Sequence, residues 1–280
     1  MEKTLDEDRV ISACNPLNDL LDPDKLPRPR FGLVTAVRAL KTDPDKKIRV
    51  WKRDIRHYFH NLRIGRKWRK YLAHPPIRKK VKRCIPRLRT VPMGFGAAAG
   101  WAQAATVVLT RRSKMPTERR LMAGQTLPGD LPMWASIIDD LWIVAQTEEA
   151  DSDTPELVRR WLAAYQEECD EEGVPIHVGK NIDGATKAEV QCYAVDGDSH
   201  TWGASHTRRW QALQAGLHLL LHYRAPPLRM VERLLGKLGF CQGMRPCTRS
   251  PLQYIYRAIV DTREGPGGAC CGARWPRRRF

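Results

Sequence analysis

The chain has 280 residues, 42% of them hydrophobic, so it can bury a core as one elaborate domain or as two smaller ones. Lys and Arg outnumber Asp and Glu by 48 to 31, and the formal net charge of +17 attracts polyanions such as nucleic acid or an anionic membrane surface. No apolar run approaches the roughly twenty residues that cross a bilayer, and the acidic start MEKTLDEDR is unlike a signal peptide. We therefore expect an intracellular protein, cytoplasmic or nuclear, with no membrane partner.

Charged residues are distributed unevenly. Residues 66–89 carry eleven Lys or Arg and no acid, whereas residues 139–172 carry twelve acids. A run of cations is often only a solvated face. This run lies between two candidate active-site segments, so we expect it to bind nucleic-acid phosphates. The eight cysteines form no CxxC pair and are expected to be reduced thiols.

Hydrophobic periodicity predicts alternating helices and strands. In chain order these are an amphipathic helix over 32–42, a strand over 48–55, a helix over 97–112, a hairpin over 135–145, strands over 188–195 and 200–202, and helices on both sides of residues 225–227. In the strand that reads VWKRD, Lys52 and Arg53 must reach solvent, template or acid, because a central strand is usually apolar.

The clearest predicted helix follows residue 154. Thr154 can cap it, Pro155 suits its first position and Gly173 closes it. Its apolar face consists of Leu157, Trp161, Leu162, Tyr165 and Cys169. In the helices near the C-terminus, apolar residues recur at Trp210, Leu213, Leu217 and Leu221, and then at Leu228, Val231, Leu234, Leu235 and Leu238.

Three aspartates are candidates for chemistry. Asp139 and Asp140 lie between two apolar runs, where ionised carboxylates cost several kcal/mol to bury without a neighbouring cation. Asp54 ends another predicted strand, so the three carboxylates can converge. Oxygen ligands of this kind suit Mg²⁺, and two metal ions on three carboxylates serve in-line phosphoryl transfer. The alternative is that the Asp pair is a turn sequence and Asp54 a helix cap.

The order of motifs resembles the reverse transcriptases of retroviruses and retrotransposons, most closely those of tyrosine-recombinase retrotransposons and plant pararetroviruses. The resemblance covers residues 8 to 256. It rests on DRVISACNPLND (8–19), DIRHYFHNLRI (54–64), VPMGFGAAAGWAQ (91–103), IIDDL (137–141), GVPIHVGK (173–180), TWG (201–203) and RLLGKLGF (233–240). In the first of these, Arg9 and Asn18 match the family's fingers motif, whereas Asn15 replaces its usual second arginine.

The resemblance implies a role for each matching residue. The catalytic set would be Asp54, Asp139 and Asp140 as ligands of two Mg²⁺ or Mn²⁺ ions, with Lys180 protonating the pyrophosphate leaving group. Arg9, Phe59, Met93, Gly94 and Gln103 would bind the nucleotide, with Arg9 on its phosphates and Phe59 excluding a 2′-hydroxyl. Trp202 and Gly203 would form the primer grip.

The fold implied is an α+β right-hand polymerase, with a palm built on a ferredoxin-like antiparallel sheet. Partial fingers are expected over 1–30 and 66–90, the palm over 31–65 and 91–203, a helical thumb over 204–260, and a disordered tail over 261–280. In the thumb, cations that include Arg208, Arg233 and Lys237 would follow the duplex.

The predicted activity is RNA-directed DNA synthesis, in which dNTPs are added to a primer 3′-hydroxyl on an RNA or DNA template. A first alternative is a catalytically inactive nucleic-acid-binding remnant of a mobile element, motivated by Asn15 and by the absence of the first fingers strand. A second is an RNA-dependent RNA polymerase, which Phe59 disfavours.

Overall fold

The computed structural model describes residues 14–22, 24–26, 29–32, 34–73, 77–79, 82–85, 87–122, 125, 127–148, 154–223 and 226–264. The chain forms two compact units. The first comprises Met1–Ala188 and Asp196–His200, and the second comprises Glu189–Val195 and Thr201–Phe280. Each unit has a hydrophobic core of its own.

A four-stranded antiparallel sheet forms the centre of the first unit. Its order is β4-β5-β1-β6, with β1 at Lys47–Asp54, β4 at Met133–Ile137, β5 at Asp140–Thr147 and β6 at Ile182–Ala185. The strand expected over 48–55 and the hairpin expected over 135–145 are both confirmed. The register pairs Asp54 at the end of β1 with Asp140 at the start of β5.

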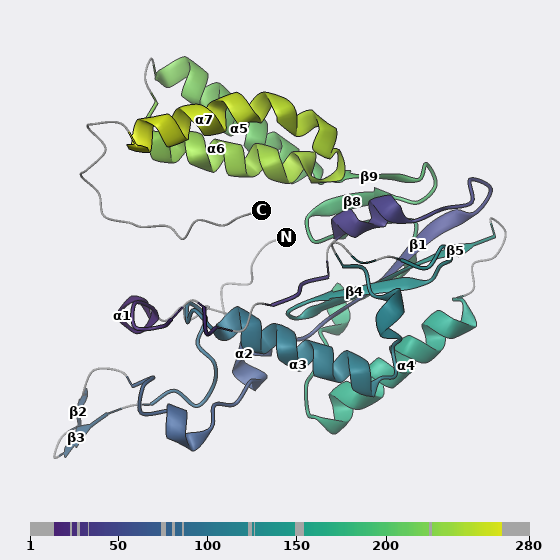
Figure 1. The fold of residues 1–280 in the computed structure, drawn as a ribbon. Coiled ribbons are helices and arrows are strands. Elements are labelled where there is room, and N and C mark those ends of the chain that lie inside the picture. Colours follow the sequence, from purple (N-terminus) through teal and green to yellow (C-terminus); the bar gives the residue numbers. More distant parts are fainter. Residues whose placement is uncertain are drawn as a thin grey trace. The chain divides into compact units, whose positions relative to one another are not determined.

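Two helices cover one face of this sheet, α3 at Ala98–Arg112 and α4 at Glu156–Glu171 (Figure 1). Trp51 and Ile55 of the β1 segment pack into the same core as Trp161 and Tyr165 of α4. Side chains alternate along a strand, so Asp54 faces away from this helical layer. The face that carries Asp54 is buried as well, because Val50 and Trp142 are fully covered there, and Asp54 lies at its end.

The expected apolar face of α4 is confirmed with one addition. Trp161, Tyr165 and Cys169 are buried, Leu157 and Leu162 pack against them, and Val158 is buried as well. Gly173, with φ of +65°, follows the helix as expected. The Thr154 cap is wrong: the helix begins at Glu156 after Pro155, and no side chain caps it.

The expected helix over 32–42 is replaced by a short 3₁₀ helix. This element, η1 at Val34–Ala39, buries Val34 and Val37. Their spacing of three residues aligns them in a 3₁₀ turn, which explains the tighter conformation. The remaining short elements of this unit are α1 at Asn15–Asn18, α2 at Tyr58–Asn61, η2 at Arg66–Trp68, β2 at Ile77–Lys79, β3 at Lys82–Cys84, η3 at Thr117–Arg119 and η4 at Val178–Lys180.

The strand expected over 188–195 is wrong because it is two strands. Gln191 and Cys192 both have positive φ, of 50° and 63°, and this turn separates β7 at Lys187–Val190 from β8 at Tyr193–Asp196. The strand expected at 200–202 is confirmed as β9 at Thr201–Ala204. These strands form a sheet of order β7-β8-β9.

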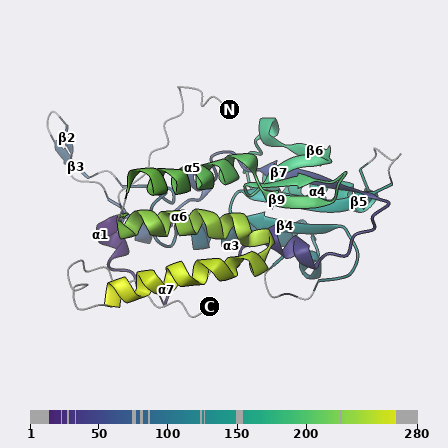
Figure 2. The same cartoon turned by 90° about the horizontal axis from the view of Figure 1, so that it is seen from above.

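Three helices lie side by side in the second unit, α5 at His206–His222, α6 at Leu228–Cys241 and α7 at Ser250–Glu264 (Figure 2). The short helices η5 at Gln242–Met244 and η6 at Pro246–Arg249 join α6 to α7. Leu235, Leu252 and Ile259 form the core. Helix α7 extends to residue 264, so the expected tail begins as helix, and its remainder lies outside the described residues.

The apolar row expected on the first of these helices lies on α5 and is exposed. Trp210, Leu213, Leu217 and Leu221 remain 46% to 75% accessible, whereas α5 buries Ala212 and Leu219. None of the helices in the described residues combines the length and the apolar character that a membrane-spanning segment needs.

Candidate carboxylate site

The three predicted aspartates lie at one corner of the sheet. Asp54 ends β1 directly opposite Asp140, and Asp139 lies in the turn between β4 and β5. The backbone N–H of Ile55 donates to the Asp139 carbonyl oxygen at 3.0 Å, which ties the end of β1 to the turn. Asp54 is only 6% exposed. The strand end therefore lies beside the hairpin tip as expected, but the expected convergence of the three carboxylates within reach of a shared ion is not found in the described residues.

Two lysines face the carboxylates. Lys180 Nζ lies 3.1 Å from Oδ1 and 3.4 Å from Oδ2 of Asp54. Lys52 Nζ lies 3.0 Å from Asp140 Oδ1. Lys52 and Asp54 share a strand face, and Asp140 is diagonal to Lys52 across the β1–β5 pair, which explains the contact. Lys52 therefore reaches an acid, one of the three destinations that the sequence left open.

Burial shifts the ionisation of the hairpin acids. Desolvation raises the pKa of Asp140 to about 6, although Lys52 opposes the shift. Desolvation also raises the pKa of Asp139 above its usual range, and the nearby Asp54 charge adds to the increase. Removal from water disfavours a charged carboxylate, and a like charge disfavours it further. Burial is therefore the main cost of ionising Asp139 and Asp140, and Lys52 offsets part of it at Asp140.

The donor set fits a divalent cation by its chemistry. Carboxylate oxygens are the ligands that Mg²⁺ and Mn²⁺ prefer, and an added cation would offset the cost of burying Asp139 and Asp140. In the present side-chain arrangement, the described residues contain no group of three acidic, His or Cys side chains close enough to hold one ion. Lys52 and Lys180 lie against the acids, so metal binding requires these side chains to move.

Helix α3 holds the hairpin that carries Asp139 and Asp140. Gln103 Oε1 accepts from the Ile138 N–H at 2.8 Å, and its Nε2 donates to the Ser136 oxygens at 3.3 Å. The Thr106 hydroxyl donates to the Ile138 carbonyl oxygen. Gln103 is 2% exposed, and its buried amide forms its hydrogen bonds with the hairpin. The sequence marked Gln103 as a nucleotide contact and did not indicate this positioning role.

Ile138 occupies the turn with φ of +52°, a left-handed conformation that is unusual for a β-branched residue. The side chains of Gln103 and Thr106 on α3 hold it there through hydrogen bonds to its backbone N–H and carbonyl oxygen. Tyr58 supports the same helix, because its hydroxyl donates to the Ala102 carbonyl oxygen at 2.8 Å and lies 2.6 Å from Thr106 Oγ1. Burial raises the pKa of Tyr58 to about 12, so this hydroxyl stays protonated.

The other expected nucleotide-binding residues lie in several places. Phe59 is half-buried and packs against two apolar clusters of the first unit. Gly94 has φ of +101° and is exposed, next to a half-buried Met93. Asn18 holds this loop, donating to the Gly94 carbonyl oxygen at 2.8 Å and accepting from the Gly96 N–H at 2.7 Å. Arg9 lies outside the described residues.

The basic segment 66–89 combines cations with exposed aromatic rings. Trp68 is 50% and Tyr71 56% exposed, and Lys70 Nζ lies 4.9 Å from the centre of the Tyr71 ring. Lys67 approaches Trp68 in the same manner, at 5.8 Å. Aromatic faces beside positive charges suit a nucleic-acid strand. The expected primer-grip residues, Trp202 and Gly203, are half-buried on β9.

No protein-family model and no curated protein matches the chain. Its fold is similar to that of a foamy viral protease–reverse transcriptase solved with double-stranded DNA, with a TM-score of 0.59 and 12% identity over 91% of this chain. A foamy viral protease–reverse transcriptase solved with an RNA/DNA hybrid gives a TM-score of 0.53 and 14% identity over 90% of the chain. The chain spans only 37% and 28% of those two proteins. The likeness establishes a reverse-transcriptase-like fold of helices and antiparallel sheet.

Proposed function

We propose that this protein is an RNA-directed DNA polymerase that adds dNTPs to the 3′-hydroxyl of a primer paired with an RNA or DNA template. The observation that carries the proposal is the meeting of Asp54, Asp139 and Asp140 at one corner of an antiparallel sheet, in a fold similar to that of a reverse transcriptase. In this proposal the four-stranded sheet with α3 and α4 is the palm, the basic segment belongs to the fingers, and α5 to α7 form the thumb.

The carboxylates of Asp54, Asp139 and Asp140 would hold two Mg²⁺ or Mn²⁺ ions. When bound, such ions lower the pKa of an attacking hydroxyl and neutralise the charge that develops at phosphorus. Burial raises the pKa values of Asp139 and Asp140, chiefly by desolvation, and a bound cation would favour their ionised forms and so offset that cost.

The lysines of the site have separate proposed roles. Lys180 lies beside Asp54 and would donate its proton to the pyrophosphate leaving group. Lys52 would neutralise Asp140, the hairpin acid that it already contacts. Gln103 would act as a positioning residue, because it holds the turn that presents Asp139 and Asp140.

The nucleotide pocket is proposed from the resemblance and from the position of the residues. Phe59 follows Asp54 by five residues, and its half-buried ring would lie under the sugar and exclude a 2′-hydroxyl. Arg9 would bind the nucleotide phosphates. Met93 and the exposed backbone at Gly94 would border the base and sugar of the nucleotide. Gln103 would support this pocket through the hairpin that it holds. Trp202 and Gly203 would contact the primer end.

A second candidate function is nucleic-acid binding without catalysis. Two of the three acids already have an ammonium group beside them, and no three acids of the described chain are close enough to share an ion. A protein that uses Lys52 and Lys180 to neutralise its acids permanently would keep the fold and lose turnover. A third candidate, RNA synthesis, is disfavoured by the ring at Phe59.

Primer extension on an RNA template with Mg²⁺ or Mn²⁺ distinguishes these functions. We expect the wild type to extend a primer with dNTPs and not with NTPs, and Asp139→Asn to extend it at least about 10²-fold more slowly, because a metal ligand is lost. Asp170→Asn, an exposed change on α4, is the matched control. Equal extension by wild type and Asp139→Asn would reject the polymerase, and extension with NTPs alone would favour RNA synthesis.

A further inference from the structure

Two histidines lie one turn apart near the end of α5. His218 and His222 are both exposed, and their ring centres are 4.7 Å apart with the ring planes at 45°. Residues four apart in a helix share one face, with Cβ atoms about 5–6 Å apart, so the backbone itself brings these imidazoles together. Within the described part of the chain, neither imidazole forms a hydrogen bond or an ion pair, so both rings can accept a ligand.

The separation of the two rings suits a shared metal ion. In a tetrahedral zinc site an imidazole nitrogen lies about 2.1 Å from the ion, which places the centres of two bound rings about 5 Å apart. The observed 4.7 Å is close to this value. Tyr223 contacts His218 edge to face, with ring centres 5.7 Å apart, and so restricts the orientation of that imidazole. The pair therefore needs only rotations of exposed side chains to bind an ion.

The composition of this part of α5 selects the class of ion. From Trp210 to Tyr223 the sequence contains no Asp, Glu, Lys or Arg, so the helix offers neutral nitrogen ligands and no competing charge. Mg²⁺ and Ca²⁺ prefer oxygen ligands, whereas imidazole suits Zn²⁺, Ni²⁺ and Cu²⁺. No third His, Cys, Asp or Glu joins the pair among the described residues. Water would complete the coordination of an ion held by two histidines.

The end of a helix is a favourable place for a cation. Helix α5 ends at His222, and Tyr223 continues in an extended conformation. The last carbonyl groups give this end of the helix a partial negative charge. The buried residues of α5 are Ala212 and Leu219, so little packing holds its last turn. An ion bound to both histidines would join the last two turns and reduce fraying.

We propose that His218 and His222 form a binding site for a transition-metal dication of the zinc class, with Tyr223 as a positioning residue. The bound ion would fix the end of α5 next to the exposed Leu217 and Leu221 of its apolar row. The inference goes beyond the proposed polymerase activity, because the site uses neither the three aspartates nor a nucleic acid.

Hydrogen exchange of the full chain, followed by mass spectrometry with and without ZnCl₂, tests the site. An ion held by both histidines must be released before the end of α5 can open. Exchange of the amides of residues 219–222 should therefore slow by about 10-fold when free Zn²⁺ is about ten times its Kd, and EDTA should restore the rate. Because the measurement is confined to the end of α5, zinc bound by cysteines elsewhere in the chain does not produce this result.

Matched variants locate the effect. His218→Gln and His222→Gln should each abolish the slowing by zinc, and glutamine favours a helix at least as well as histidine, so the fold should be retained. His206→Gln changes an exposed histidine in the first turn of α5 and should keep the slowing. MgCl₂ at the same concentration should have no effect.

Three results would overturn the proposal. The first is an unchanged exchange rate in the wild type at zinc concentrations up to about 1 mM, which corresponds to binding weaker than about 4 kcal/mol. The second is slowing by zinc that persists in either His218→Gln or His222→Gln. The third is equal slowing by MgCl₂, which would indicate a general effect of ionic strength.

The same measurement on Asp139→Asn separates this inference from the proposed activity. We expect this variant to keep the slowing by zinc, and its loss would assign the effect to the carboxylate site and overturn the proposal. If the wild type fails to extend a primer and zinc still slows exchange in α5, the polymerase proposal fails alone. If the wild type extends a primer and zinc leaves α5 unchanged, the metal-site proposal fails alone.

Discussion

At the scale of single residues, the three acids of the site differ in the cation that faces them. Lys180 contacts Asp54 and Lys52 contacts Asp140, whereas Asp139 forms no ion pair within the described chain. The two lysines act on Asp139 only at longer range. Asp139 is therefore the carboxylate most available to a new cation.

Lys180→Gln tests the proton donor. If the Lys180 ammonium protonates the leaving group, this change should lower the rate of nucleotide addition by about 10²- to 10⁴-fold, with a smaller effect on nucleotide affinity. Single-turnover primer extension over a range of nucleotide concentrations measures the rate and the affinity separately. Lys187→Gln, an exposed lysine on β7, is the control. An unchanged rate of nucleotide addition would mean that Lys180 only neutralises the charge of Asp54.

Asp140→Asn tests the cost of the buried charge. The folded pKa of Asp140 is raised above its unfolded value, so the folded state binds more protons between pH 4 and 6, and stability falls as pH rises through that window. In EDTA the variant should be more stable than the wild type at pH 7, by about 1–3 kcal/mol, and should match it below pH 4.

Urea denaturation at both pH values measures this difference. Asp170→Asn, whose side chain is exposed, should show no such dependence. A variant less stable than the wild type at pH 7 would mean that the pair with Lys52 outweighs the desolvation of Asp140.

At the scale of elements, the β4–β5 hairpin depends on α3 for its geometry. The turn at Ile138 has a conformation that a β-branched residue rarely adopts, and the helix supplies both of the hydrogen bonds that hold it. The helix is placed in turn by Tyr58, from the segment that follows Asp54. The end of β1, the helix and the hairpin thus form one connected support for the acids.

Gln103→Ala tests this support. The change leaves the part-buried Ile138 N–H without its acceptor and removes one of the donors to the Ser136 carbonyl oxygen, which keeps the Gly32 N–H, so the free energy of unfolding should fall by about 1–3 kcal/mol. Hydrogen exchange at the Ile138 amide should accelerate, and primer extension should slow even where the protein remains folded. Gln166→Ala on the exposed side of α4 is the control. An unchanged rate of hydrogen exchange at the Ile138 amide would contradict the proposal that Gln103 holds the hairpin turn.

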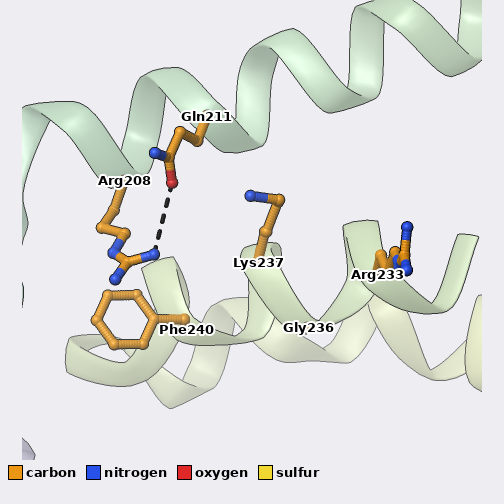
Figure 3. Close-up of a pocket in the computed structure, with 6 residues that line it drawn as sticks. All are labelled: Arg208, Gln211, Arg233, Gly236, Lys237 and Phe240. Atoms are coloured by element: carbon orange, nitrogen blue, oxygen red, sulfur yellow. Dashed lines mark hydrogen bonds between the residues drawn. The ribbon is translucent and has the colours of Figure 1, made fainter. Parts of the chain in front are cut away.

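At the scale of the whole molecule, each of the two compact units contains a group of cationic residues. The first contains the basic segment 66–89 besides the acidic site, and in the second Arg208, Arg233 and Lys237 line a cavity between α5 and α6 (Figure 3). A net charge of +17 creates a long-range field that attracts polyanions whatever their base sequence. Binding should therefore depend strongly on ionic strength and weakly on sequence.

Salt dependence provides the test. If six to ten phosphates are neutralised, duplex affinity should fall by about 10³- to 10⁵-fold between 50 and 200 mM salt. Anisotropy with duplexes of unrelated sequence should give the same slope. A duplex of the same bases on the uncharged backbone of peptide nucleic acid should not bind. Binding that is insensitive to salt would contradict a phosphate-driven interaction.

The sequence by itself determined the local elements and the identity of the acids. Alternating apolar runs predicted β1 and the hairpin, the period of Trp161, Tyr165 and Cys169 predicted α4, and the position of Asp54 at a strand end predicted its meeting with the hairpin. These features depend on side-chain periods of two and 3.6 residues, which neighbouring residues specify. They correspond to the reverse-transcriptase-like fold that the comparison with foamy viral proteins supports.

Only the tertiary structure decided which groups face one another. The pairing register places Lys52 beside Asp140, and the packing of α3 brings the Gln103 amide into hydrogen bonds with the hairpin. The packing of α5 leaves its apolar row exposed and places Arg208 and Lys237 in the lining of one cavity. Each of these contacts joins residues of different elements. Their geometry depends on how a strand register and a helix crossing are selected by the whole core, which no local pattern specifies.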